Sequence, residues 1–378
     1  MPRKAGKVFV WPLCTRIIHW MIVLSFVTAF ITSFYEHLLH YHVGLGALFG
    51  IMLIYRTIWG FIGPRYATFN TFKLRPVELK DYFVEKVRDR WRKIPPGHNP
   101  ASSWYTLLVL STGIVIVVSG LLLYGIEEGK GFFSFLNPKY YTYMDLLGGV
   151  HKYSAYFLAV WACIHITGVL IEQFYHKTSM VFAMITGYKK SEGLDTEMCP
   201  WRNVISYGTI LAALFNFYIV EKDNDNIFVK SRFEPIDYKK ENRDFATECG
   251  DCHKPYPPYL LPERSWERII ADLDNHFGEE ITEANITKAQ QANILAYLKA
   301  NSAEHSTHEA AFKILKSLNG RAPKAVTKTP YWRAVHKEIP RWVFKHKKVK
   351  DKSNCKACHI DFEKGILEDR NIRVPVDY

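Results

Sequence analysis

Two copies of one five-residue pattern, Cys-x-x-Cys-His, lie in the last third of this 378-residue chain. The copies are Cys249-Gly-Asp-Cys252-His253 and Cys355-Lys-Ala-Cys358-His359. Two thiols three residues apart can bond to the two vinyl groups of one porphyrin, and the histidine that follows then reaches the iron. The pattern therefore predicts two covalently attached c-type haems, with the four cysteines as attachment points and the two histidines as iron ligands.

Two other interpretations of these cysteines are weaker. Paired Cys-x-x-Cys units also bind zinc, but a zinc site needs no histidine directly after each pair. Cysteines at this spacing also serve redox or metal chemistry more often than they form a structural disulfide. Because the histidine recurs in both copies, the sequence favours haem.

Long apolar segments precede these motifs and are the elements that must hold any membrane cofactor. Four runs, about residues 15–36, 41–62, 104–126 and 149–171, each have the length of about 20 residues that a bilayer-spanning helix needs. A fifth run, about residues 203–220, is shorter and contains Asn216. We expect a multi-pass membrane protein.

Four histidines lie within these runs, where an ionisable side chain is costly and indicates function. His151 and His165 are both in the fourth run and 14 residues apart, about 21 Å of helix and close to four full turns, so they share one face at two depths. His19 matches His165 in depth, and His42 matches His151. The pairing predicts two b-type haems stacked through a four-helix bundle, each held by two histidines. His37 and His40 could replace His42 at the outer site.

The distribution of basic residues predicts the orientation. Residues 1–10, 64–102 and 174–202 contain 16 Lys and Arg, whereas the opposite-side segments 37–40 and 127–148 contain two. By the positive-inside rule the N-terminus is cytoplasmic, and five spans place the C-terminal part in the periplasm of a bacterium with the spans in its inner membrane. Covalent haem attachment needs an oxidising compartment, which agrees with a periplasmic location of the two CxxCH motifs. The net charge of +12 is thus mostly a topology signal and does not indicate nucleic-acid binding.

The first two runs and their flanks contain a set of characteristic segments, namely Trp11-Pro12, Thr15-Arg16-Ile17-Ile18-His19-Trp20, His42-Val43-Gly44-Leu45-Gly46 and Arg56 to Tyr66. These segments resemble the prokaryotic cytochrome b561 family, which includes the cytochrome b subunits of nickel-iron hydrogenases, and the resemblance extends over about residues 8–190. It implies a four-helix bundle with two b haems that exchanges electrons with a membrane quinone. It also suggests His19, His42, His151 and His165 as the ligands.

The C-terminal part must supply a second ligand for each c haem. We expect a helix capped by Ser265 that runs to about His276 before Gly278, a helix at about 286–298, and a short helix from Thr329-Pro330 to Pro340 that carries His336. No methionine follows Met198, so His276 and His336 are the best candidates for the first and second haem. His305, His308 and His346 remain possible. A basic run, Arg341 to Lys350, could attract an acidic partner.

The C-terminal part contains a set of characteristic segments, namely Glu248 to His253 with Tyr256-Pro-Pro, Ser265-Trp266, Asn275-His276-Phe277-Gly278, Tyr331-Trp332 with His336, and Asn354 to His359. Over about residues 244–375 this part resembles the dihaem cytochrome c family. The resemblance implies two haems with two histidine ligands each and supports His276 and His336. Members are associated with a small oxygen-binding haem protein, which suggests a soluble periplasmic c-type cytochrome or oxidoreductase as partner.

Together these features predict a mainly α protein. We expect a cytochrome b561-like domain with two b haems at 1–200, a fifth anchoring span at 201–222, a linker at 223–245, and a mostly helical periplasmic dihaem domain at 246–378. The predicted function is electron transfer between quinone and periplasmic partners, with quinol oxidation as the favoured direction. The alternatives are electron entry from a periplasmic donor such as a hydrogenase, and a membrane-tethered dihaem binding or sensor module.

Overall fold

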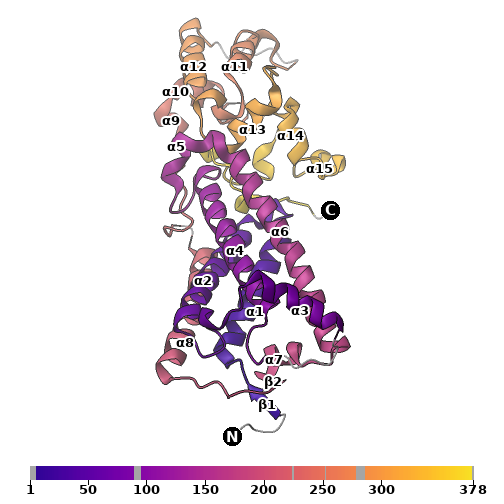
Figure 1. Cartoon of the computed structure of the whole chain (residues 1–378). Coiled ribbons are helices and arrows are strands. Elements are labelled where there is room, and N and C mark those ends of the chain that lie inside the picture. Colours follow the sequence, from indigo (N-terminus) through magenta and orange to yellow (C-terminus); the bar gives the residue numbers. More distant parts are fainter. Residues whose placement is uncertain (1–5, 89–94, 224, 252, 278–285, 377–378) are drawn as a thin grey trace. The chain divides into compact units, whose positions relative to one another are not determined.

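The computed structural model describes residues 6–88, 95–223, 225–251, 253–277 and 286–376 (Figure 1). The chain divides into two compact units. The first contains residues 1–122 and 145–226, and the second contains residues 123–144 and 227–378. The chain therefore passes from one unit to the other three times.

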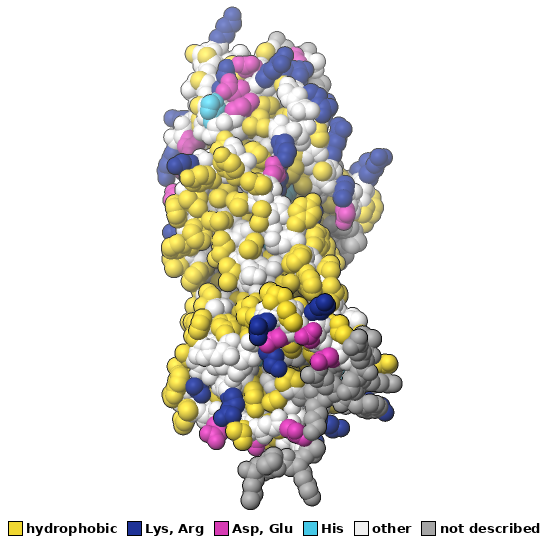
Figure 2. Space-filling model, in the orientation of Figure 1, with side chains coloured by type: hydrophobic (Ala, Val, Ile, Leu, Met, Phe, Trp, Pro, Cys, Tyr) yellow, Lys and Arg dark blue, Asp and Glu magenta, His cyan; other side chains and the backbone are white. Residues whose placement is uncertain are grey.

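Five long helices dominate the first unit, although the last residues of one of them belong to the second. They are α1 (Leu13–Thr32), α2 (Leu39–Ile62), α4 (Pro100–Ile126), α6 (Met144–Leu170) and α8 (Pro200–Lys222). All five are long and apolar enough to cross a membrane, which confirms the predicted spans, including the fifth. Many of their large apolar side chains are exposed, and Figure 2 shows hydrophobic side chains covering much of the visible face.

The fifth long helix packs against the second and is therefore part of the helix bundle. The Tyr55 hydroxyl of α2 lies 2.7 Å from the Ser206 hydroxyl of α8, and both groups are buried. Trp59, also on α2, is fully buried and donates its indole N–H to Thr15 Oγ1 of α1 at 3.2 Å. In a lipid environment, such polar contacts and close packing hold helices together, because apolar surface gains little from leaving lipid.

Short elements close the end of the first unit that carries the N-terminus. Strands β1 (Gly6–Phe9) and β2 (Tyr188–Ser191) pair antiparallel, and α3 (Pro76–Arg88) and α7 (Met180–Thr186) lie in the connections. Gly187 follows α7 with φ +87°, a left-handed conformation that favours glycine. A π-helical turn, Ile171–Tyr175, ends the fourth span. Sequence patterns gave no sign of the two strands.

The second unit is built from short helices around one apolar core. They are α5 (Asn137–Tyr140), α9 (Tyr238–Glu241), α10 (Arg243–Glu248), α11 (Glu263–Ile270), α12 (Lys288–Ala300), α13 (Glu309–Leu318), α14 (Pro330–Val335) and α15 (Arg341–Lys345). The core includes Leu261, Trp266, Ile294, Leu298 and Ile314, each less than 10% exposed. Short 3₁₀ turns connect elements in both units, at Glu36–Leu38, Phe69–Thr71, Ser134–Leu136, Tyr141–Tyr143, Pro258–Leu260, Leu273–Asn275, Ala303–His305, Val326–Lys328, Cys355–Ala357, Phe362–Lys364 and Asp369–Asn371.

Helix α11 differs from its prediction at both ends. It begins at Glu263 with Pro262 as the cap residue, so Ser265 lies inside the first turn, fully buried, and is not the cap. The helix ends at Ile270, and a separate 3₁₀ turn leads to His276. Proline is well tolerated just before and at helix starts because no N–H is needed there, and this signal prevailed over the serine. The predicted terminator Gly278 lies outside the described residues.

The other two predicted helices of this unit agree more closely with the structure. Helix α12 begins two residues later than expected, because Thr287 and Gln290 form a reciprocal capping box. The cap at Thr329 and the proline in the first turn of α14 are confirmed. However, α14 ends at Val335, and a separate helix α15 follows Pro340.

The connection between α4 and α6 folds with the C-terminal part of the chain. Asn137 is fully buried and donates Nδ2 hydrogens to the carbonyls of Ile126, at 2.7 Å, and Thr307, at 3.0 Å. Arg232 Nη1 donates to Asn137 Oδ1 at 2.6 Å, and Lys313 pairs with Glu127 at 2.7 Å. These contacts explain why residues 123–144 belong to the second unit.

Candidate haem sites

Helices α2 and α6 bring two of the predicted membrane ligands together. The ring centres of His42 and His151 are 5.9 Å apart, and the rings are nearly perpendicular at 83°. A metal–nitrogen bond is about 2.0 Å, and the nitrogen lies about 1.2 Å from the ring centre, so an iron midway between two imidazoles would hold the ring centres about 6.4 Å apart. The spacing of this pair fits an iron with two histidine ligands.

Backbone carbonyls orient both rings. His42 Nδ1 donates to the Ala29 carbonyl at 2.9 Å, and His151 Nδ1 donates to the Ile116 carbonyl at 3.0 Å. A carbonyl can only accept, so the proton is on Nδ1 and the Nε2 lone pair is available to a metal. Gly120 is required beside this pair, because a Cβ there would lie 2.9 Å from His151 Cε1.

Of the three histidines on or just before α2, His42 is the one that pairs with His151. His40 Nε2 lies 3.8 Å from Glu221 Oε2, and its ring lies 4.0 Å from that of Tyr41. The His37 ring contacts Tyr35 at 5.9 Å. Both therefore have other neighbours.

The other predicted pair consists of His19 on α1 and His165 on α6. His165 stacks on Tyr105 of α4 with ring centres 4.3 Å apart. Among the described residues, His19 Nδ1 and Arg56 Nη1 are buried without a hydrogen-bond partner. A buried guanidinium with an unused arm suits a carboxylate, and haem carries two propionates, so this end of the bundle fits the cofactor.

The second unit pairs each motif histidine with its predicted partner. The ring centres of His253 and His276 are 6.4 Å apart, and those of His336 and His359 are 6.2 Å apart. Both spacings match the same two-ligand geometry. His253 Nδ1 donates to the Lys254 carbonyl at 3.0 Å and His336 Nδ1 to the Trp332 carbonyl at 2.9 Å, which again leaves Nε2 available.

Burial keeps one histidine and two cysteines of the two motifs uncharged. It lowers the pKa of His359 to about 4, with a further contribution from His336, so the imidazole is neutral at pH 7. It also raises the pKa of Cys355 to about 11 and that of Cys249 to about 12. Protonated thiols are poor zinc ligands and poor nucleophiles. Cys358 is partly buried, and Cys252 lies outside the described residues.

The remaining histidine candidates of the second unit lie apart from these pairs. His308 is stacked between Phe233, at 3.8 Å, and Tyr259, at 4.1 Å. His305 Nε2 lies 2.8 Å from Glu263 Oε1. His346 Nδ1 accepts a hydrogen bond from the Lys348 backbone.

Sequence analysis named Tyr256 and Trp332 only among the segments that resemble dihaem cytochromes c, and it assigned no role at the haem sites to either of them or to Tyr105. Tyr256 touches the His253 ring at 5.6 Å and donates its hydroxyl to the Ser353 carbonyl, two residues before Cys355. It therefore links the two motifs. Trp332 stacks on His336 at 4.4 Å, and Tyr105 covers His165 as described above. The spacing of Trp332 and His336, one helical turn, was the only signal that could have indicated a contact.

Histidine pairs within apolar helices, together with a helical unit that carries two CxxCH motifs, define a membrane-bound electron-transfer cytochrome. Residues 10–187 match the prokaryotic cytochrome b561 family, and residues 245–367 match the dihaem cytochrome c family. The two matches do not overlap, so each family model accounts for a different part of the chain. These families imply that it binds haem b and haem c.

Known proteins resemble each half separately. Probable Ni/Fe-hydrogenase B-type cytochrome subunits of Azotobacter chroococcum mcd 1 and Rhodobacter capsulatus are 25% and 24% identical. Each match covers 50% of this chain, and 90% and 83% of the respective relative. A diheme cytochrome c from Rhodobacter sphaeroides is 36% identical, with 33% of this chain and 95% of that chain covered and a TM-score of 0.29. A diheme cytochrome c from Shewanella baltica OS155 is 31% identical, with 36% of this chain and 94% of that chain covered and a TM-score of 0.29.

Proposed function

We propose that this protein carries electrons between the quinone pool of a bacterial inner membrane and periplasmic redox partners through two b haems and two c haems. His19 with His165, and His42 with His151, would hold the b haems. His253 with His276, and His336 with His359, would hold the c haems, which are attached through Cys249, Cys252, Cys355 and Cys358. The observation that carries this proposal is the histidine spacing of 5.9–6.4 Å, which recurs in three pairs.

The side chains suit electron transfer better than catalysis at an iron. Each haem, when bound, accepts and releases one electron at its iron, at a potential set by ligands and surroundings. Two histidines per iron leave no open coordination position for a substrate. Four of the rings, those of His42, His151, His253 and His336, are fixed by backbone carbonyls that receive their Nδ1 hydrogens, which also makes each a better donor.

We assign quinol as the electron donor and a soluble periplasmic c-type cytochrome as the acceptor. The excess of basic residues in segments 1–10, 64–102 and 174–202 supports a cytoplasmic N-terminus, and five spans then leave the c-type half in the periplasm. There a soluble partner can reach it. Exposed lysines of the Arg341–Lys350 run, such as Lys345 and Lys347, would attract an acidic surface and raise the association rate.

The opposite direction is the second candidate, and the relatives favour it. Proteins similar to residues 10–187 include probable subunits of Ni/Fe hydrogenases. In such an arrangement a periplasmic donor would reduce the c haems, and quinone would be the acceptor. A module that is merely tethered by the spans is a third possibility, which the following experiment separates from the other two.

The test uses the full-length protein in detergent. Pyridine haemochrome spectra should count two b and two c haems, and anaerobic addition of a quinol should reduce both classes. His19→Leu should remove one b haem and slow reduction of the c haems by quinol, whereas His37→Leu, a substitution of the same type at an exposed position, should change neither. Two c haems without any b haem in the folded wild-type protein would refute the proposal and favour the tethered module.

A further inference from the structure

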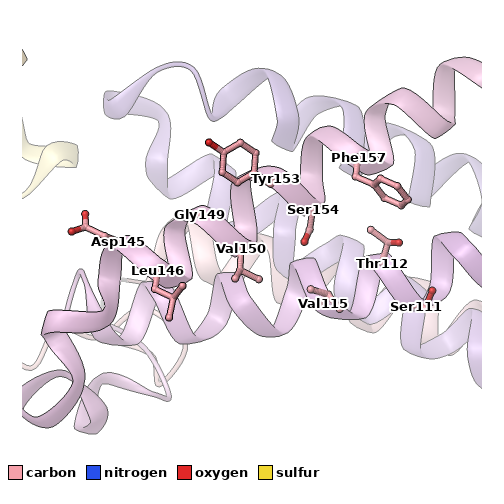
Figure 3. Close-up of a pocket in the computed structure, with 10 residues that line it drawn as sticks. All are labelled: Ser111, Thr112, Val115, Asp145, Leu146, Gly149, Val150, Tyr153, Ser154 and Phe157. Atoms are coloured by element: carbon pink, nitrogen blue, oxygen red, sulfur yellow. The ribbon is translucent and has the colours of Figure 1, made fainter.

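A groove of 740 Å³ runs along the outer half of the membrane helices α4 and α6 (Figure 3). Its volume is within the range of 300–1,000 Å³ that is typical of sites for small molecules and cofactors. Apolar side chains make up most of its walls, among them Val115 of α4 and Leu146, Val150 and Phe157 of α6. All four are more than 40% exposed, so the groove is open to the lipid phase.

Two hydroxyl groups in this groove lack the partner that such groups usually have in a membrane helix. Ser25, Thr57 and Ser119, for example, donate to the carbonyl four residues earlier. In the part of the chain that the structure describes, the side-chain hydroxyls of Thr112 and Ser154 make no hydrogen bond, and the two residues lie on facing walls of the groove (Figure 3). An unpaired hydroxyl in hydrocarbon is unfavourable, so these groups suit a ligand with polar oxygens.

The groove also lies against the helix that carries an outer b-haem ligand. Val150 faces the groove, and His151 follows it, about 100° round the helix. Ser154, three residues after His151, lies about 60° from it round the helix, in the angle between His151 and Val150. On α4, His151 Nδ1 donates to the carbonyl of Ile116, the residue after Val115 of the groove wall, so a ligand in the groove would lie close to the His42–His151 pair.

We propose that this groove binds an isoprenoid quinol and is the site at which the membrane carrier exchanges electrons with the outer b haem. The inference rests on the proposed function and locates its quinone site. Thr112 and Ser154 donate to the ring oxygens, and the apolar walls and the open side accommodate the isoprenoid tail.

Oxidation of quinol at this site breaks two O–H bonds and leaves quinone. The outer b haem that His42 and His151 would hold would accept the two electrons one at a time and would pass them on to the c-type half. The two protons leave at the outer mouth, where the lining offers one carboxylate, Asp145. If electrons enter from a periplasmic donor instead, the same groove binds quinone and the same bonds form in reverse.

Two adjacent glycines of α6 provide a matched pair of variants. A Cβ at Gly148 or at Gly149 would meet no atom within 4 Å, so both positions accept a larger side chain. Only Gly149 lines the groove. Gly149→Phe should therefore fill the site, and Gly148→Phe should serve as the control.

The first measurement is covalent labelling of detergent-purified protein with a photoreactive azidoquinone, which does not depend on turnover. Label should appear in peptides from 100–126 and 144–170, fall at least fivefold in Gly149→Phe, and persist in Gly148→Phe. The second measurement is reduction of the b haems by quinol. Thr112→Val with Ser154→Ala, which keeps the volume, should raise the KM for quinol on the order of tenfold, because two hydrogen bonds are lost.

Three outcomes would overturn the inference. Equal labelling and equal quinol kinetics in both glycine variants would mean that the groove holds only bilayer lipid. Loss of the outer b haem in Gly149→Phe alone would mean that the groove holds the edge of the porphyrin. Labelling elsewhere in the chain would place the quinone site there. In all three cases quinol would still reduce the wild type, whereas failure of the proposed function would show as no reduction of any variant by quinol.

Discussion

Replacement of Asn137 by alanine should loosen the second unit, in which the connection between α4 and α6 folds against the C-terminal part. Asn137 is fully buried and makes three hydrogen bonds, to the Ile126 carbonyl, the Thr307 carbonyl and Arg232. Alanine leaves two carbonyls and one guanidinium arm without that partner. A buried group left unpaired costs about 1–3 kcal/mol. Arg232 still donates to the Thr307 hydroxyl at 3.1 Å, so the loss of Asn137 costs less at Arg232 than at the two carbonyls.

The expected total loss is about 3–5 kcal/mol of unfolding free energy. For a unit of this size that corresponds to a fall of the melting temperature by about 10 °C. The assay is thermal unfolding in detergent, followed by the Soret absorbance of the c haems, with Thr142→Ala as the control because Thr142 is exposed in the same connection. A melting temperature of Asn137→Ala within about 2 °C of the wild type would refute the reasoning that this network holds the unit together.

Three further predictions concern charge and ligation. Burial, with Glu309 nearby, raises the pKa of Glu128 to about 8 from its usual 4.5, so the folded state binds the proton more tightly than the unfolded state does. The stability that the protonated Glu128 contributes is therefore lost as the pH rises through about 8. In urea unfolding of the holoprotein, the free energy of unfolding of Glu128→Gln should exceed that of the wild type by roughly 2 kcal/mol at pH 9 and by little at pH 4. A difference that does not depend on pH would contradict the raised pKa of Glu128. His42→Leu should remove one b haem from the haemochrome count while His37→Leu retains both, and the opposite pattern would make His37 the ligand. His336→Ala should leave the second c haem attached but open one coordination position, so the reduced variant should bind carbon monoxide; an unchanged spectrum under carbon monoxide would mean that another side chain holds that position.

The sequence by itself determined the class of the protein, because the relevant signals are local. A CxxCH motif is complete within five residues, and the length and apolar character of a span are properties of one continuous segment. The depth of a histidine follows from its position along that segment, so His42 and His151 could be paired without a structure. Thr329-Pro330 fixed a helix start in the same way, through two adjacent residues.

The tertiary structure decided everything that depends on residues far apart in the chain. Only packing could show that Tyr256 links the two haem motifs, that Gly120 makes room for His151, and that the fifth span packs on the second through Tyr55 and Ser206. The end of α11 at Ile270 is of this kind as well, because helix propensity alone gives no reason to stop before His276. Side-chain contacts between distant segments set these features, and no local pattern encodes them.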